Sequence, residues 1–197
     1  MYAIAAAALD WAIGKGGDQL CYIPADLKRF KALTTGHAVI LGRRTLATFP
    51  GGRPLPGRRN LVLSRDPAFA PQGAEVYRSL EALLAAAPED AFVIGGEQVY
   101  RQLLPFCSTV YLTRLEKVWE GADAFFPDLD ADPAWTLVDR QGPPRHQPIS
   151  FSSDTSPAGA PRWGGLEKAA WIQRDPGRSF LRAALKSPFY WTLILVR

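Results

Sequence analysis

Short apolar runs, each followed by turn residues and then by a segment with helical spacing, recur along most of the chain. Runs of this length are typical of buried strands. Their alternation with helices predicts an α/β fold, with a doubly wound, mostly parallel central sheet flanked by helices and ligands at the carboxyl ends of the strands. The predicted strands are 2–9, 37–42, 60–64, 75–77, 91–94 and 109–115, and the predicted helices are 24–33, 43–49, 80–87 and 98–104.

The C-terminal part differs in composition. Residues 142–165 are rich in Pro, Gly and Ser, and short helices are predicted at 166–174 and 178–186. The last run, 189–196, is strongly apolar, so we expect it to return to the sheet as an antiparallel C-terminal strand. The length of 197 residues and the apolar content of 47% fit a single domain. That domain is expected to carry an insertion at about 142–187.

Cysteine content and charge argue against several classes of protein. Cys21 and Cys107 have no metal-ligand spacing, which argues against zinc, and so few cysteines indicate reduced thiols in the cytoplasm. The apolar run 4–9 lacks a basic flank and is too short for a signal peptide or a membrane span. The net charge of +4 lies in the C-terminal part. No nucleic-acid module accompanies it, so surface charge is the preferred interpretation.

Asp26 lies in a predicted helix whose apolar face is formed by Leu27, Phe30 and Leu33. Pro24 suits the first turn because its missing N–H is not needed there. Helical spacing turns the apolar face toward a core and puts Asp26 at its edge. Two interpretations stay open. Asp26 is either a half-solvated acid favoured by the helix dipole, or a carboxyl group at the floor of an apolar pocket, where burial raises its pKa for proton chemistry.

Three glycine-containing junctions are candidate binding segments. Residues 10–18 are dense in glycine but do not match G-x-G-x-x-G, because Gln19 stands at the last glycine position; this segment is a plain loop or a lid. Gly42 is followed at once by two arginines and Thr45 at the start of a helix, a corner that attracts phosphate. Gly95–Gly96 joins a core strand to a helix and lets a backbone approach a ligand closely.

Four motifs, in this order, together resemble bacterial dihydrofolate reductase. They are Ile-Pro-Ala-Asp-Leu-Lys-Arg-Phe-Lys at 23–31, Leu-Gly-Arg-Arg-Thr at 41–45, Pro-Leu-Pro-Gly-Arg-Arg-Asn at 54–60 and Val-Ile-Gly-Gly-Glu-Gln-Val-Tyr at 93–100. Ala-Ile-Gly-Lys at 12–15 and Tyr-Leu-Thr at 111–113 add to the resemblance. It covers about residues 1–139 and resumes at 189–197.

The resemblance implies reduction of 7,8-dihydrofolate to tetrahydrofolate with NADPH, in support of thymidylate and one-carbon metabolism, and binding of antifolates. Asp26 matches the family's pterin-binding carboxylate, which promotes protonation of the pterin through water, and Thr113 matches the threonine that supports it. Arg58 would bind the carboxylate of the glutamate tail. The residues expected to line the substrate site are Ile4, Ala5, Ala6, Leu27, Phe30, Lys31, Phe49, Leu55, Arg58, Ile94 and Tyr100.

The resemblance also implies a site for NADPH and none for a metal. Arg43, Arg44 and Thr45 match the phosphate corner, Arg65 would reach the 2′-phosphate, and residues 14–20 would form a lid. The glycine pair would be joined by a cis peptide. The residues expected to bind NADPH are Ala6, Ile13, Gly14, Leu20, Gly42, Arg43, Arg44, Thr45, Ser64, Arg65, Gly95, Gly96, Glu97, Gln98, Val99 and Tyr100.

Two departures from the family, the insertion at about 142–187 and Cys21, and two rival functions accompany this hypothesis. Cys21 stands where the family usually has a Trp that holds a pocket water. A pyrimidine reductase of riboflavin synthesis would share the fold and cofactor, but would not be expected to carry both the Pro-Ala-Asp-Leu helix and the Arg58 loop. A non-catalytic relative that binds NADPH or nucleic acid is the second rival, suggested by the basic C-terminal part. We expect a monomer, because the motifs need no second chain.

Overall fold

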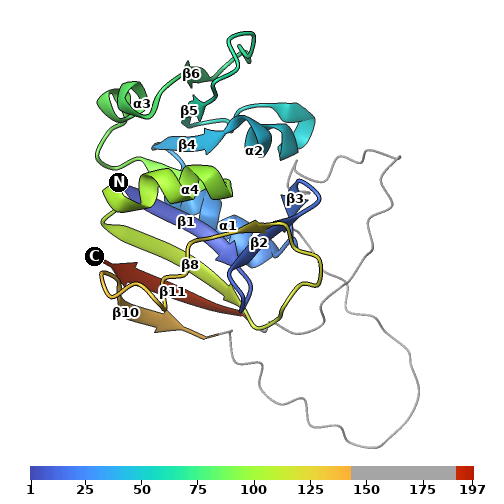
Figure 1. Ribbon diagram of the computed structural model, residues 1–197, viewed down its shortest axis with the longest axis vertical. Coiled ribbons are helices and arrows are strands. Elements are labelled where there is room, and N and C mark those ends of the chain that lie inside the picture. Colours follow the sequence, from blue (N-terminus) through green and yellow to red (C-terminus); the bar gives the residue numbers. More distant parts are fainter. Residues whose placement is uncertain (143–189) are drawn as a thin grey trace, which may run out of the picture. The chain divides into compact units, whose positions relative to one another are not determined.

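The computed structural model describes residues 1–142 and 190–197. The predicted insertion and the helices predicted at 166–174 and 178–186 lie outside the described residues. The described part forms one eight-stranded sheet, in the order β10-β11-β8-β1-β7-β4-β5-β6, and one three-stranded sheet, in the order β3-β2-β9 (Figure 1). None of its helices is long and apolar enough to span a bilayer.

The elements follow the alternation expected from the sequence. The strands of the large sheet are β1 (Tyr2–Ala7), β4 (Ala38–Gly42), β5 (Arg59–Leu63), β6 (Glu75–Tyr77), β7 (Phe92–Gly95), β8 (Thr109–Leu115), β10 (Thr136–Gln141) and β11 (Tyr190–Val196). The helices are α1 (Pro24–Thr34), α2 (Arg43–Thr48), α3 (Leu80–Ala86) and α4 (Glu97–Leu103), with 3-10 turns η1 (Pro50–Gly52) and η2 (Leu104–Phe106).

The sheet is parallel from β8 to β6 and antiparallel at its other edge, where β11 pairs with β8 and with β10. The predicted fold class and the return of the last strand are therefore confirmed. Strand β10 was not predicted. It is an edge strand with almost no buried residue, and a bulge between Leu137 and Asp139 interrupts its pairing, so it lacks the alternation that marks a half-buried strand.

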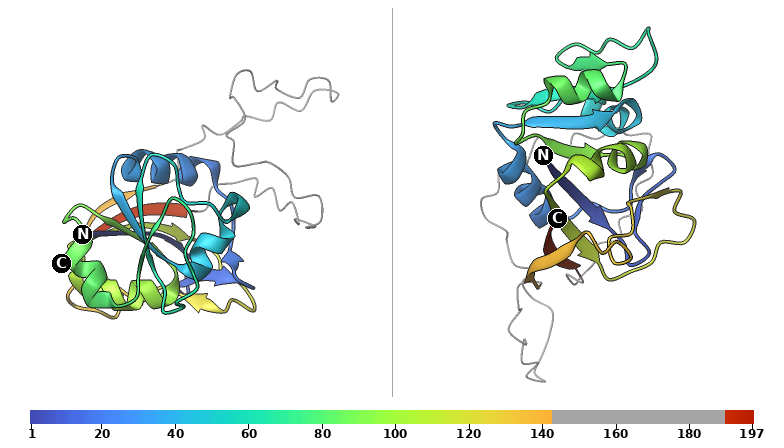
Figure 2. Two further views of the ribbon diagram at one scale, coloured as in Figure 1. Left: turned by 90° about the horizontal axis from the view of Figure 1, so that it is seen from above. Right: turned by 60° about the vertical axis from the view of Figure 1, so that its left-hand side comes forward.

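Alternate residues of the central strands enter two separate cores. Helix α1 lies across the sheet from α3 and α4 (Figure 2), and Leu46 of α2 packs in the same core as α1. The α1/α2 core is built from Ile4, Val39, Leu41, Leu46, Leu55, Val62, Phe92 and Ile94. The α3/α4 core includes Ala3, Ile40, Leu61, Leu83, Val93, Leu103, Val110 and Leu112. Because successive residues of a central strand enter opposite cores, nearly every position is buried, and the strand is a continuous apolar run in the sequence.

The glycine-dense segment after β1 is a hairpin, where the sequence predicted a loop. Strands β2 (Ala12–Lys15) and β3 (Asp18–Gln19) are joined by Gly16 and Gly17, whose φ angles are 61° and 80°. Two successive positive φ angles suit a two-residue hairpin turn, which glycine allows without steric cost. Strand β9 (Ala124–Phe125) pairs with the other edge of β2.

Candidate active site

Asp26 lies in the first turn of α1, and its carboxylate accepts a hydrogen bond from Thr113 Oγ1 of β8. Thr113 is fully buried. Burial raises the pKa of Asp26 above its ordinary value, while the Thr113 hydrogen bond and the charge of Arg29 lower it by less. Asp26 is half-buried, and the direction of its pKa agrees with the interpretation of a carboxyl group in an apolar pocket.

The C-terminal strand brings two more residues to the face of the sheet that carries Thr113. In the antiparallel register, Thr192 lies opposite Thr113 and Tyr190 lies opposite Leu115. Burial raises the pKa of Tyr190, and the charge of Asp26 raises it further. Sequence reasoning missed both residues, because the register of a returning strand is not visible in its apolar pattern.

Cys21 lies beside the same carboxylate. Burial raises the pKa of the Cys21 thiol to about 11, and the charge of Asp26 adds to this shift, whereas Lys117 opposes it. The thiol is therefore protonated at neutral pH. It offers only a weak donor at the position where the family usually has an indole N–H.

Most of the predicted substrate residues meet in the α1/α2 core. Ile4, Leu55 and Ile94 are buried there, and Phe30 and Phe49 pack against them. Ala6 is half-buried, and Tyr100 is buried with its hydroxyl donating to the Ile4 carbonyl at 2.7 Å. Ala5 faces the opposite core, so it can contribute only backbone to this face. Lys31 is exposed.

Leu27 corrects one expectation. Its spacing placed it with Phe30 and Leu33 against a core, but its surface is 39% exposed. Phe30 and Leu33 pack on the α1/α2 core, and Thr34 is the buried residue of helix α1. Helix α1 is thus seated by its C-terminal half, which leaves the turn that carries Asp26 and Leu27 above the core.

Arg58 is held at the C-terminal end of α1. Its Nε donates to Thr34 Oγ1 at 2.8 Å, and its Nη1 donates to the Pro56 carbonyl at 2.9 Å. Its Nη2 is buried and has no hydrogen-bond partner among the described residues. Burial lowers the pKa of this guanidinium. An unpaired buried donor costs free energy, and an incoming carboxylate would satisfy it.

The cofactor corner predicted at 42–45 is only partly free. The guanidinium of Arg43 pairs with Asp66, and Ser64 is buried and accepts from the Asp66 N–H at 3.3 Å. Arg44 and Arg65 are exposed, and neither makes a hydrogen bond or ion pair within the described part of the chain. These two arginines are therefore the cations of the corner that remain available to a phosphate.

The ends of β4 and β7 approach each other without side chains between them. The Gly95–Gly96 peptide is cis, as the resemblance implied. A Cβ on Gly96 would lie 3.1 Å from Thr45 Oγ1, and one on Gly42 would lie 3.2 Å from a Val99 methyl group. A side chain at either glycine would therefore require Thr45 or Val99 to shift.

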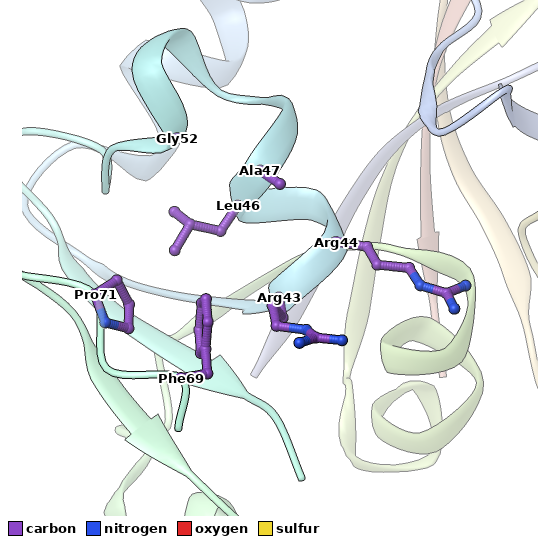
Figure 3. Close-up of a pocket in the computed structure, with 7 residues that line it drawn as sticks. All are labelled: Arg43, Arg44, Leu46, Ala47, Gly52, Phe69 and Pro71. Carbon is purple, nitrogen blue, oxygen red and sulfur yellow. The ribbon is translucent and has the colours of Figure 1, made fainter. Parts of the chain in front are cut away.

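A hollow of about 420 Å³ lies beside α2, next to this corner (Figure 3). It is lined by Arg43, Arg44, Leu46, Ala47, Gly52, Phe69 and Pro71. Figure 3 shows Phe69 between Pro71 and Arg43, with both guanidinium groups directed away from Leu46. The hollow shares its arginines with the cofactor corner and contains none of the residues around Asp26.

The predicted lid is the β2–β3 hairpin and the residues after it. The Gly16 N–H donates to Asp123 Oδ2 at 2.8 Å, and the Asp123 N–H donates to the Gly14 carbonyl at 3.1 Å. Lys15 Nζ donates to the Glu120 carbonyl at 2.7 Å. Ile13 and Leu20 are half-buried. These bonds fasten the hairpin to the segment 120–125. Across the described residues, no group of His, Cys, Asp or Glu side chains is arranged to hold a metal ion.

Comparison with known proteins agrees with this geometry. The dihydrofolate reductase family model matches residues 1–154. The chain is 41% identical over 153 residues to dihydrofolate reductase type 3 of Salmonella typhimurium, covering 77% of this chain and 92% of that protein. It is 45% identical over 129 residues to the dihydrofolate reductase of Neisseria meningitidis, covering 64% and 78%.

The fold is similar to that of dihydrofolate reductase from Enterococcus faecalis, which was solved in complex with NADP(H) and RAB-propyl. The TM-score is 0.69 and the sequences are 28% identical, and the match covers 100% of this chain and 95% of that one. The family model alone covers more than half of the sequence. The chain therefore belongs to the dihydrofolate reductase family, and it is an NADPH-dependent oxidoreductase that reduces 7,8-dihydrofolate to tetrahydrofolate.

Proposed function

We propose that Asp26 is the catalytic carboxylate of this reaction and that Thr113 holds it in place. The observation that carries the proposal is the hydrogen bond between these two residues at the edge of the α1/α2 core. When bound, NADPH supplies the hydride. Asp26 accepts N–H bonds from the amino and ring-nitrogen edge of the pterin, which orients the ring. Through water it also promotes protonation of the ring nitrogen next to the carbon that accepts the hydride.

The substrate lies over the buried side chains that surround this carboxylate. Ile4, Leu55 and Ile94 belong to one buried apolar cluster on this side of the sheet, and the partly buried Phe30 and Phe49 pack against it. A flat heterocycle gains affinity from such a surface and orientation from the single carboxylate. Members of this family bind dihydrofolate and antifolates, and the predicted residues Ala6, Leu27 and Lys31 belong to the same proposed site. Ala5 and Tyr100 pack in the α3/α4 core, where Ala5 can offer only backbone and Tyr100 holds the Ile4 carbonyl.

Arg58 gives the site its preference for a substrate with a carboxylate tail. Its Nη2 is a buried donor without a partner among the described residues, and Thr34 fixes the orientation of the guanidinium through Nε. A carboxylate that reaches Nη2 replaces an unsatisfied donor with a charge-assisted hydrogen bond. This feature favours a folate over the small pyrimidine of the riboflavin-type rival.

The cofactor site comprises the strand ends and the corner after β4. Arg44 and Arg65 supply free positive charge for phosphates, and Gly42, Gly95 and Gly96 let the backbone approach them. Thr45, Ser64, Gln98, Val99 and Tyr100 complete this part of the site, with Ala6, Ile13, Gly14 and Leu20 toward the lid. Arg43 belongs to the same proposed corner, where it pairs with Asp66.

The monomeric state and the cytoplasmic location predicted from the sequence are part of this proposal. Both cysteines are free thiols, which suits a reducing compartment. Nucleic acid is not required by any feature of the described site. The basic charge after residue 140 lies largely outside the described residues and keeps its interpretation as surface charge.

A substrate and cofactor panel tests the proposal. With NADPH, turnover is expected on dihydrofolate, weaker turnover on dihydropteroate, which lacks the glutamate tail, and none on the pyrimidine intermediate of riboflavin synthesis. Replacing both free arginines, Arg44→Gln and Arg65→Gln, should raise the KM for NADPH by about 10-fold or more and change the KM for NADH much less. Turnover on the pyrimidine, or equal losses with both cofactors, would contradict these assignments.

A further inference from the structure

Glu97 is an acidic residue in a segment that is proposed to bind phosphate groups. It follows Gly96 directly and begins α4, in the part of the chain assigned to the phosphates of NADPH. A carboxylate there would repel a phosphate. The structure turns it elsewhere: Glu97 Oε1 pairs with Arg101 Nη2 at 3.0 Å, and Oε2 accepts from the Phe125 N–H at 3.3 Å. The Glu97 side chain is only 23% exposed, against 57% for Arg101.

Phe125 belongs to β9, the strand on which the lid is seated. In the small sheet, Phe125 pairs with Ala12 of β2, and Ala124 pairs with Gly14. Two residues before Phe125, Asp123 holds the hairpin turn through the Gly16 N–H. One short segment therefore contacts the lid through Asp123 and helix α4 through Phe125.

We propose that Glu97 is a positioning residue that ties the seat of the lid to the cofactor helix. Its carboxylate fixes β9 against α4, so the lid closes at a defined distance from the residues that hold NADPH. Arg101 compensates the charge of Glu97, which lets a carboxylate perform this role beside a phosphate site. The inference rests on the proposed cofactor site and adds a coupling between that site and the lid.

Two matched variants separate this tether from a purely electrostatic effect. Glu97→Asp keeps the charge but withdraws the carboxylate from the Phe125 N–H by about one methylene. Glu97→Gln removes the charge but keeps an oxygen that can accept from Phe125. If Glu97 is a tether, Glu97→Asp dissociates NADPH roughly 3- to 10-fold faster than the wild type, and Glu97→Gln, which keeps the contact with Phe125, does not. If it acts only through charge, Glu97→Gln is the tighter-binding variant and Glu97→Asp matches the wild type.

The measurement is the NADPH dissociation rate by stopped-flow competition, alongside the KM for dihydrofolate and the thermal midpoint. The tether predicts a change in NADPH dissociation with little change in the KM for dihydrofolate or in the midpoint, since Glu97 touches neither the pterin pocket nor a core. Arg101→Ala is the control for charge: it removes the ion pair and leaves the Phe125 contact, so its effect measures repulsion between Glu97 and the phosphates alone. A dissociation rate for Glu97→Asp equal to that of the wild type would overturn the proposal.

A double-mutant cycle with Asp123→Ala shows whether Glu97 acts through the lid. Once Asp123 no longer holds the hairpin, Glu97→Asp is expected to lose most of its effect on NADPH dissociation. Additive effects would overturn the coupling while leaving the cofactor site intact. Failure of the cofactor site itself would appear separately, as unchanged NADPH affinity in the Arg44→Gln and Arg65→Gln variants.

Discussion

Thr113 donates a hydrogen bond to Asp26 from a strand that lies 87 residues further along the chain. The two influences on this carboxylate oppose each other. Burial raises the pKa of Asp26, and the Thr113 hydrogen bond lowers it. Burial is the larger influence, so the pKa of Asp26 lies above its ordinary value, which is the direction that favours general acid–base chemistry near neutral pH.

Thr113→Val should move the pH profile of hydride transfer to higher pH. The variant removes the hydrogen bond that favours the ionised carboxylate, so the pKa of Asp26 rises further above its ordinary value. Because the reaction consumes a proton, the rate falls as pH rises through this pKa, and the falling limb follows it upward. Single-turnover rates across pH measure the limb. Thr113→Ser, which keeps the donor, should retain the wild-type profile; an unmoved limb in Thr113→Val would contradict the assigned contact.

Asp26→Asn should make the protein more stable at neutral pH. Asp26 has a pKa above its unfolded value of 3.8 because burial disfavours its charge. The ionised carboxylate therefore lowers the free energy of unfolding, and this cost grows as pH rises from the unfolded pKa through the folded pKa. Urea unfolding of both proteins at several pH values should show the advantage of Asp26→Asn at about pH 7, shrinking as the pH falls toward about 4. A variant less stable than the wild type at pH 7 would show that the carboxylate is not destabilised by burial.

Arg58→Lys should weaken the binding of substrates that carry a glutamate tail. Lysine cannot reproduce the fork that donates to Thr34 and presents Nη2 at the same time. The KM for dihydrofolate is expected to rise about 10-fold, with little change for dihydropteroate. Arg59→Lys is a matched control, because Arg59 is exposed and already pairs with Glu75. Equal losses for both substrates would place the effect of Arg58 on the fold rather than on the tail.

At Trp11, substitution by glycine should destabilise the protein no more than substitution by alanine does. Its ring lies 4.0 Å from the guanidinium carbon of Arg114 and stacks on Phe126, and its φ of 64° is in the left-handed region. Trp11→Ala is expected to cost about 3–5 kcal/mol because it removes a buried aromatic ring. Trp11→Gly should be at least as stable as Trp11→Ala, because glycine adopts this φ without strain. Chemical denaturation of both variants measures the order, and a clearly less stable glycine variant would contradict the role of the backbone conformation.

The central strands were predictable because both of their faces are buried. Neighbouring residues such as Ile40 and Leu41 enter opposite cores, so each strand is an uninterrupted apolar run in the sequence. Strand β10 lacked this signal, since it lies at the edge and is mostly exposed. The hairpin at Gly16 was missed because its strands are short and polar, although the two adjacent glycines are typical of such a turn.

The site was predictable where its residues lie within one motif, as around Asp26 and the glycine pair. Contacts between distant segments were not. The pairing of Arg43 with Asp66 and the approach of Tyr190 to Asp26 depend on how strands and loops meet in space, which spacing along the chain does not encode. The exposure of Leu27 shows the same limit, because helical periodicity gives a face but not how much of the helix is covered.

The central claim is that Asp26 carries the proton chemistry of a dihydrofolate reductase. The most direct test is oxidation of NADPH in the presence of dihydrofolate, with the wild type and Asp26→Asn compared across a range of pH. We predict fast wild-type turnover and a loss of about 10²- to 10⁴-fold in the variant, partly relieved at low pH, where the substrate arrives protonated. Wild-type turnover by the variant at neutral pH would contradict the role of Asp26.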